Sequence, residues 1–369
     1  MVHNNVMRYK VRDVFDDVTK YGTKIKTSQY LEHGKYPIFD QGKDYIAGYT
    51  NEDEGIFQKV PVILFGDHTG ILKYITRPCF LGADGVKLLK PKDSNIVVKY
   101  LFYALNNVNI PDAGYSRHFK WLKEGEIPIP PKEQQSMIVE ILDELSYIVQ
   151  KEKEMLIKFD ELVKSRFLEM FGMSEGRDKH LEDVADICSG ITKGRKVLGL
   201  ELREVPYMAV SNVKMGYIDL STVKTIMATE SEIEQYRLFS NDILMTEGGD
   251  PDKVGRGAII RNPPKDCIHQ NHIFRVRLHK DVLLPEFFEE YLQGDSARRY
   301  FLKAAKQTTG IASINMKQLR ALPVKIPPIK VQIQYSDFVH QVDKSKMAVQ
   351  KSLDELETLK KSLMQTYFG

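Results

Sequence analysis

Histidine stands beside other polar residues in two short segments of this chain, in combinations that could serve catalysis or bind a metal. The segments are Gly66-Asp67-His68-Thr69-Gly70 and His269-Gln270-Asn271-His272. Neither supplies a full set of metal ligands, and neither has visible partners for a Ser/His/Asp arrangement. We predict that both are turns or strand edges, with contact to nucleic-acid bases as the main alternative.

Two further segments match cofactor or base-binding motifs only in part. Asn262-Pro263-Pro264-Lys265 is similar to the Asn-Pro-Pro-aromatic motif with which adenine methyltransferases hold a flipped base, but Lys265 cannot stack as an aromatic ring does. Gly255-Arg256-Gly257 lacks the third glycine of a dinucleotide fingerprint and precedes no predicted helix. The sequence therefore predicts a protein that is not an enzyme, with no catalytic, cofactor-binding or metal-binding residues.

The composition limits the remaining classes of protein. At 369 residues and 42% hydrophobic, the chain can bury two ordinary cores, while its net charge of +3 gives no bulk attraction to nucleic acid. Cys79, Cys188 and Cys267 lie far apart in the sequence, which favours free thiols in a reducing compartment. There is no signal-peptide segment and no apolar run near about 20 residues, so we expect a cytoplasmic protein with no membrane partner.

A long amphipathic segment occurs twice and organises the whole chain. The first copy begins at Ile129-Pro130-Pro131 and ends at Phe171-Gly172. The second begins at Ile326-Pro327-Pro328 and ends at Phe368-Gly369, so the same offset of 197 residues joins both pairs of anchors without a gap. A repeat of this kind indicates two similar halves, each a domain followed by a long helix that glycine stops.

The two helices are predicted to pair with each other. Apolar residues recur at spacings of three and four in both copies, although Glu152 and Arg166 interrupt the first seam. About 39 residues make a rod of ~58 Å, so a helix packed only on its own domain would leave much of its seam exposed. We therefore expect an antiparallel coiled coil. A protein with a two-fold repeat also suits a ligand that is roughly two-fold, such as duplex DNA.

The segments before the helices are predicted to be β-rich domains with similar frames and different inserts. Short β-like runs, such as Val60-Pro61-Val62-Ile63-Leu64-Phe65, are separated by Gly, Asn and Asp, and a short helical stretch follows in each domain (98–106 and 285–305). The second domain is longer by 27 residues. The sequence thus predicts an α+β fold, with two β-rich globular domains separated by two long helices that form an antiparallel coiled coil.

Residues that could contact DNA gather in the glycine-rich loops and ahead of the long helices. Duplex recognition needs Lys and Arg for phosphates, and Arg, Lys, Asn, Gln or His for base edges. In the first domain we predict contacts from Tyr115, Ser116, Arg117, His118 and Lys120, with Lys43, His68 and Lys73 as weaker candidates. In the second domain the candidates are Lys253, Arg256, Gln270, Asn271 and His272, and a basic stretch is predicted to follow phosphates: Arg298, Arg299, Lys303 and Lys306. The alternative for each of them alone is a solvated surface residue.

The duplicated Ile-Pro-Pro starts with a following Gln, the Phe-Gly ends and the loop Tyr115-Ser116-Arg117-His118-Phe119-Lys120 resemble the specificity subunits of Type I restriction-modification systems. The resemblance covers the whole chain. The second copy departs slightly from the pattern, with Ile329-Lys330-Val331 where the first has Lys132-Glu133-Gln134. The resemblance implies two target recognition domains, each reading one half of a bipartite DNA sequence, and two conserved helices that set the spacing and dock two methyltransferase subunits.

On this resemblance we expect target recognition domain 1 at 1–128, a central conserved helix at 129–172, target recognition domain 2 at 173–325 and a C-terminal conserved helix at 326–369. The chain would bind double-stranded DNA and no cofactor. Chemistry would reside in partners, namely methyltransferase (modification) subunits that bind S-adenosylmethionine and restriction subunits that translocate and cleave DNA. The main alternative is a coiled-coil scaffold with two protein-binding β-rich domains. The missing cofactor motif disfavours an autonomous methyltransferase.

Overall fold

The computed structural model describes residues 6–82, 85–111, 116–172, 176–196, 201–249, 254–308 and 311–369. Contacts divide the chain into two compact units. Unit 1 comprises Met1–Glu154 and Gln350–Gly369, and unit 2 comprises Met155–Val349. Each unit therefore joins a β-rich domain to a part of both long helices, a composition that the sequence repeat alone does not specify.

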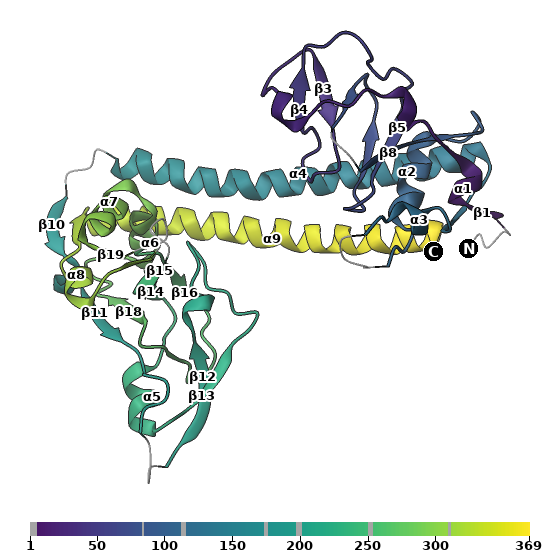
Figure 1. Cartoon of the computed structure of the whole chain (residues 1–369). Helices are drawn as coiled ribbons and strands as arrows, with labels where there is room; N and C mark the ends of the chain where they lie inside the picture. The colour runs from purple at the N-terminus through teal and green to yellow at the C-terminus, as the bar shows by residue number, and fades with distance from the viewer. Residues whose placement is uncertain are drawn as a thin grey trace. The chain divides into compact units, whose positions relative to one another are not determined.

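The two long helices are confirmed. Helix α4 spans Lys132–Phe171 and helix α9 spans Ile329–Phe368, 40 residues each. Within unit 1 the beginning of α4 lies beside the end of α9, and within unit 2 the end of α4 lies beside the beginning of α9, so the helices pair antiparallel (Figure 1). An ion pair crosses the seam in each unit, at 2.6 Å in both: Lys153–Glu357 in unit 1 and Lys346–Asp160 in unit 2.

Both polar interruptions of the first seam find partners on the facing helix. The hydroxyl of Ser352 donates a hydrogen bond of 2.7 Å to Glu152 Oε1. The Arg166 guanidinium lies 5.8 Å from the centroid of the Phe338 ring and forms an ion pair of 2.7 Å with Glu169. Each of the two residues thus has a partner across the interface, although Glu152 Oε2 and Arg166 Nε are buried without a hydrogen bond among the described residues, and neither residue breaks the pairing.

In its described residues, the domain of unit 1 contains three small sheets. A four-stranded antiparallel sheet has the order β2 (Phe15–Asp17), β8 (Val86–Pro91), β5 (Val62–Gly66), β6 (Leu72–Ile75). A three-stranded sheet has the order β4 (Gly48–Thr50), β3 (Tyr36–Phe39), β7 (Phe80–Leu81), with β3 parallel to β7. Strands β1 (Arg8–Lys10) and β9 (Glu126–Pro128) pair where the domain begins and ends, and the helices are α1 (Val11–Val14), α2 (Val98–Asn106) and α3 (Phe119–Leu122).

The domain of unit 2 repeats this topology strand for strand. Its four-stranded sheet has the order β11 (Ala185–Ser189), β18 (Ile273–Leu278), β14 (Asp242–Thr246), β16 (Gly257–Ile260). Its three-stranded sheet is β13 (Lys224–Ala228), β12 (Arg203–Met208), β17 (Ile268–His269), again with the last two parallel, and β10 (Arg177–His180) pairs with β21 (Pro323–Ile326). Strands β5 and β14 are inner strands of the two four-stranded sheets and are buried along their whole length, which explains the apolar runs at their centres.

Unit 2 extends an element that it shares with unit 1, the short helix ahead of the long one, and adds others that the described part of unit 1 does not contain. The helical stretch predicted at 285–305 is two helices, α6 (Pro285–Gln293) and α7 (Asp295–Ala304), because Gly294 adopts an extended conformation between them. A small sheet of β15 (Gly248–Gly249), β20 (Ile311–Ser313) and β19 (Lys306–Thr308) follows the turn after β14. The remaining helices are α5 (Glu230–Tyr236) and α8 (Met316–Arg320). These additions account for the greater length of the second domain.

A buried glutamine fastens each domain to the helix that follows it. Gln135 Nε2 donates to Pro130 O at 2.8 Å, and its Oε1 accepts from Val97 N, just ahead of α2, at 2.9 Å. Gln332, 197 residues later, donates to Pro327 O at 2.9 Å and accepts from Leu284 N, just ahead of α6, at 2.9 Å. The Gln shared by the two repeats is therefore a structural clamp.

Replacing either clamp with Met should destabilise its unit by about 2–3 kcal/mol, because a side chain of similar size would leave a buried N–H and a buried carbonyl without partners. Chemical denaturation of Gln135→Met and Gln332→Met measures the loss. Gln150→Met, on an exposed part of α4, serves as the control and should change stability by less than about 0.5 kcal/mol. Equal stability of all three variants would contradict the clamp.

The Phe-Gly ends of the long helices are anchors as well as stops. Phe171 packs against Phe287 of α6, with ring centroids 4.8 Å apart, inside unit 2. Phe368 packs against Tyr100 of α2 at 5.3 Å, inside unit 1. Arg8 also donates to the carbonyl of Gly369 at 2.9 Å. Each long helix thus begins on the domain that precedes it in sequence and ends in the core of the other unit.

Candidate nucleic-acid interface

Asp67 joins two of the predicted DNA-contacting loops in unit 1. It follows strand β5 directly and is buried. Its main-chain carbonyl accepts from His118 N at 2.7 Å, its carboxylate accepts from Phe119 N at 2.9 Å, and its own N–H donates to Gly85 O at 2.6 Å. The turn after β5, the loop before β8 and the loop before α3 therefore meet at one end of the four-stranded sheet.

Gln41 adds a further loop to the same place. Its side-chain Oε1 accepts from His68 N at 3.1 Å, and its carbonyl accepts from the Thr69 hydroxyl at 2.9 Å. The exposed Lys43 lies two residues along this loop. The structure thus brings together six of the residues predicted for the first domain: Lys43, His68, Ser116, Arg117, His118 and Lys120. We call this set of loops the unit 1 loop cluster.

The accessible residues of the unit 1 loop cluster are of the types that contact nucleic acid. Arg117 and Lys120 are exposed, and His118 is half-buried. The Lys120 ammonium lies 4.1 Å from the centroid of the Trp121 ring, and the rings of His118 and Trp121 meet edge to face at 5.7 Å. The sequence prediction missed Trp121, the only tryptophan of the chain. Its position next to a basic loop was the available signal, since aromatic rings offer stacking surface to bases.

Lys73 does not belong to the accessible set, although the sequence suggested it as a weaker candidate. Its side chain is 3% exposed, its ammonium donates to Asp44 O at 2.6 Å, and Asp40 lies 3.6 Å away. Burial lowers the pKa of Lys73. The side chain supports the loop at residues 40–44 from beneath, and we do not include it among the proposed DNA contacts.

Unit 2 holds its loops with the same frame. Glu247 follows strand β14 as Asp67 follows β5. Its carbonyl accepts from Ile314 N at 2.8 Å, and its N–H donates to His272 O at 3.0 Å, which are the same two main-chain bonds that Asp67 makes. The turn after β5 in unit 1 is short, and Gly66 N donates to Ile71 O across it. The turn after β14 in unit 2 is longer, and Thr246 N donates to Arg256 O across it. The frames coincide while the loops differ.

Three predicted residues of the second domain lie side by side in this frame. His272 is exposed, and its Nδ1 lies 2.5 Å from Glu247 Oε2. Asn271 is half-buried and precedes it. Gln270 is tied by its main chain, which donates to Met208 O at 3.0 Å, and its side chain accepts from Val210 N at 3.4 Å. His269, by contrast, is fully buried, and burial lowers its pKa to about 4, so it is a neutral core residue.

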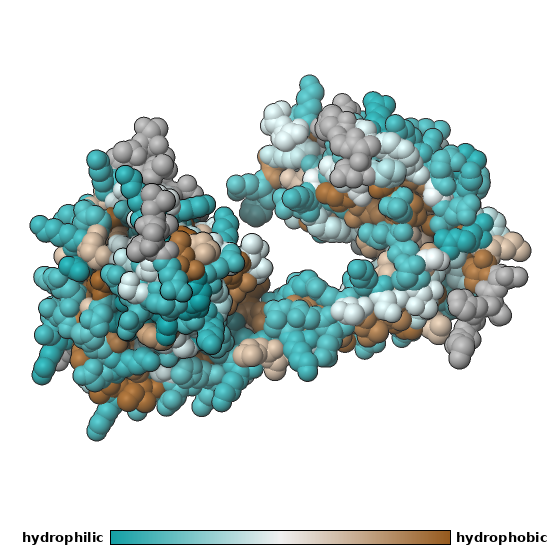
Figure 2. Space-filling view, turned by 90° about the horizontal axis from the view of Figure 1, so that it is seen from below, coloured by the Kyte–Doolittle hydropathy of each residue, from teal (hydrophilic) through white to brown (hydrophobic). Residues whose placement is uncertain are grey.

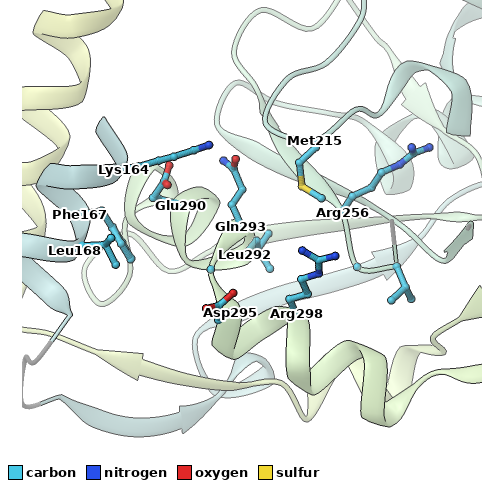
Figure 3. Close-up of a pocket in the computed structure, with 13 residues that line it drawn as sticks. Lys164, Phe167, Leu168, Met215, Arg256, Glu290, Leu292, Gln293, Asp295 and Arg298 are labelled. Carbon is cyan, nitrogen blue, oxygen red and sulfur yellow. The ribbon is translucent and has the colours of Figure 1, made fainter. Parts of the chain in front are cut away.

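Arg256 and Arg298 line one cavity of about 430 Å³ in unit 2 (Figure 3). Arg256 comes from the loop before β16 and Arg298 from α7, and Lys164 of α4 also lines the cavity. Arg256 Nε is buried with no hydrogen-bond partner among the described residues. Because an unpaired buried donor is costly, this group is suited to an acceptor that arrives from outside the chain.

The other basic residues predicted to follow phosphates are exposed. They are Arg299 and Lys303 on α7 and Lys306 at the start of β19. Tyr115 and Lys253 lie outside the residues that the structure describes. In the described ranges, no group of three or more His, Cys, Asp or Glu residues could hold a metal ion, and no helix there is long and apolar enough to span a membrane.

A family profile decides what this duplicated frame is. The profile of the Type I restriction modification DNA specificity domain matches residues 4–158 and, a second time, residues 173–358. The chain belongs to this family. It is a specificity subunit with two recognition domains, one in each unit.

Curated relatives carry the same description. The chain is 26% identical over 352 residues to the Type I restriction enzyme EcoR124I/EcoR124II specificity subunit of Escherichia coli, covering 89% of this chain and 84% of the relative. It is also 26% identical over 264 residues to the EcoKI specificity subunit of Escherichia coli K12, covering 66% of this chain and 56% of that relative. The identity is low, as expected if the recognition loops diverge while the frame stays.

Solved structures share the fold. A crystal structure of a Type I restriction-modification system S subunit from M. genitalium matches 100% of this chain and 98% of its own, with a TM-score of 0.61 at 16% identity. A structure described under the complex assembly and conformational transition of the type I restriction-modification system matches 98% of this chain and 97% of its own, with a TM-score of 0.56 at 14% identity. The predicted α+β fold of two domains and two long helices is confirmed.

Proposed function

We propose that this chain reads a bipartite duplex DNA sequence in the cytoplasm, one half-site for each recognition domain, without catalytic activity of its own. One observation carries the proposal. Asp67 and Glu247 hold equivalent loops with the same main-chain bonds, yet the loops differ in length and residue type. A constant frame with variable loops suits two sites that read different bases. The domain limits remain those predicted from the sequence.

In unit 1 the proposed base contacts come from Arg117 and His118, with Lys120 and Lys43 on phosphates. Arg117 is exposed on a loop that Asp67 fixes at both His118 and Phe119. Arginine pairs in a bidentate manner with guanine O6 and N7 in the major groove. A fixed loop loses little conformational freedom on binding, which favours selective contacts.

In unit 2 the proposed base contacts are Gln270, Asn271 and His272, and the proposed phosphate contacts are on the cavity rim and on α7. Arg256 and Arg298 line the same cavity, and the unpaired Arg256 Nε supplies a donor for a phosphate oxygen. The neighbouring basic residues of α7 and β19 would extend the path of the backbone: Arg299, Lys303 and Lys306.

We further propose that the long helices dock the catalytic partners, namely two methyltransferase subunits, which bind S-adenosylmethionine, and the restriction subunits. Large apolar side chains remain exposed on both helices, among them Tyr147, Ile157 and Leu168 of α4 and Met347 of α9. The face seen in Figure 2 is largely hydrophilic, with hydrophobic patches in each unit. Apolar side chains left exposed on a paired helix suit protein contacts.

Two substitutions should separate base reading from phosphate contact. Arg117→Ala should cost about 1–3 kcal/mol of binding free energy and relax the preference at one base position, because the loop would lose its base-edge donor. Lys303→Ala should weaken binding to all duplexes alike and lower the slope of log K against log salt by about one. Filter binding at several salt concentrations, with the methyltransferase partner present, measures both effects.

Lys346→Ala is the matched control, because Lys346 also carries one positive charge but is paired with Asp160 on the helix seam. Its affinity and salt slope should equal those of the unmodified chain. If all three variants bound every duplex as the unmodified chain does, Arg117 and Lys303 would not touch DNA. If in addition the unmodified chain preferred no duplex over another, the scaffold alternative would gain support.

A further inference from the structure

Each recognition domain contacts a long helix through a short helix, α2 on α4 and α6 on α9. The residues of the two contacts correspond position by position. Helices α2 and α6 have nine residues each, and the N–H just ahead of each one donates to the clamp glutamine. The second residues, Lys99 and Glu286, therefore correspond. On the long helices Asp143 and His340 correspond, because each lies eight residues after its clamp glutamine.

In unit 1 the domain supplies a cation and the long helix supplies an anion. Lys99 Nζ lies 2.6 Å from Asp143 Oδ2. Tyr103, one turn further along α2, donates its hydroxyl to Asp143 Oδ1 at 2.6 Å. The side chains of the ion pair are about one-third exposed, at 34% and 35%, so solvent screens the pair only in part.

In unit 2 the carboxylate comes from the domain instead, and its partner on the long helix is a histidine, which is charged only when protonated. The domain supplies Glu286, whose side chain is 5% exposed, and the long helix supplies His340, with Nε2 and Oε1 3.0 Å apart. The other charged groups that face Glu286 are mixed. Arg261 lies 3.9 Å from Glu286, 3.8 Å from Glu289 and 3.2 Å from Asp343 of α9.

We propose that these oppositely oriented pairs are a charge key that decides which recognition domain each long helix accepts. Helix α4 accepts a domain with a cation at the second position of its short helix, and α9 accepts a domain with a carboxylate there. The second domain, moved onto α4, would place Glu286 and its neighbour Glu290, the counterpart of Tyr103, against Asp143. Three carboxylates in one partly buried contact repel one another and lose their donors.

The reverse move is less costly. The first domain on α9 would bring Lys99 and Tyr103 to His340, and Arg261 would be absent because it belongs to the second domain. Asp343 of α9 would lie one turn away and could accept part of the charge. The two long helices therefore differ in how well each would accept the other recognition domain. A recognition domain can move between halves only together with a change at position 143 or 340, whereas exchange within one half needs no such change if the charge is kept.

The key can be tested in the full-length chain without DNA. Lys99→Glu reproduces the mismatch in unit 1, and we expect the midpoint of thermal unfolding to fall by about 3–6 °C. Lys99→Glu combined with Asp143→His recreates the polarity of unit 2 and should recover more than half of that loss. Lys99→Gln is the matched control, because it removes the ion pair and the contact with Tyr74 without adding a negative charge. Its unfolding midpoint should lie between those of Lys99→Glu and the double variant.

The same test in unit 2 gives an independent result if the Lys99 and Asp143 variants fail to fold. His340→Asp should lower the midpoint by a similar amount, and His340→Asp with Glu286→Lys should restore it. If either double variant unfolds no later than its single variant, or if Lys99→Glu is no worse than Lys99→Gln, polarity does not matter and the key is wrong. Because unfolding is measured without DNA, this outcome is independent of the proposed DNA reading.

Discussion

Replacing residues 14–126 by the equivalent domain of a related specificity subunit should change one half of the recognised DNA sequence completely and leave the other half unchanged. The expected effect is large because every proposed contact with that half-site lies inside the exchanged segment. The domain would keep its contacts from Lys99 to α4 and from Tyr100 to α9 if the donor carries a cation and an aromatic ring at these two positions.

Sequencing of duplexes selected by the exchanged protein measures the result. The reciprocal exchange of the second domain, from Val184 to Pro323, is the control and should alter only the other half-site. Simultaneous change of both half-sites in either exchange would show that the two domains do not read DNA independently.

The second large effect should follow from lengthening the helix pair. Four residues inserted after Glu154 and four after Lys351 add one turn, about 6 Å, to both helices. The two insertion points lie nearly opposite each other on the paired helices, since Glu152 contacts Ser352 and Lys153 contacts Glu357. If the helices set the spacing between half-sites, the preferred spacer should lengthen by one or two base pairs while both half-site sequences stay the same.

A single residue inserted at the same two points is the informative comparison. It rotates the rest of each helix by about 100°, which turns the apolar seam away from its partner and should abolish assembly. Binding of duplexes with spacers of different length measures both variants. An unchanged spacer preference in the four-residue variant would mean that helix length is not the ruler.

The long helices and the duplicated fold could be predicted because their signals are repeated and periodic. Apolar spacing of three and four residues fixed the type of element, and the offset between Gln135 and Gln332 gave the register of the two halves. The break at Gly294 was missed, because a single glycine can be tolerated inside a helical pattern and does not by itself mark the end of a helix. Each unit contains a part of both long helices because Phe171 packs in unit 2 and Phe368 packs in unit 1. Sequence alone does not specify these packing partners.

The loop residues were harder to predict because their role depends on neighbours far away in sequence. Lys43, His68 and His118 meet only because Gln41 and Asp67 hold their loops together. A basic residue type does not show whether the side chain is exposed and can contact DNA or is buried and supports a loop. Lys73 is buried and supports a loop. The charge key was invisible for the same reason, since Lys99 and Asp143 are 44 residues apart.

Selection from a pool of fully randomised duplexes tests the central claim most directly. The full chain, with its methyltransferase partner bound, would be used to enrich duplexes over several rounds, and the bound fraction would be sequenced. The account predicts two short conserved blocks separated by a spacer of constant length and free sequence, and Arg117→Ala should blur one block only. A single continuous block, or no enriched sequence at all, would contradict the claim that each recognition domain reads one half-site.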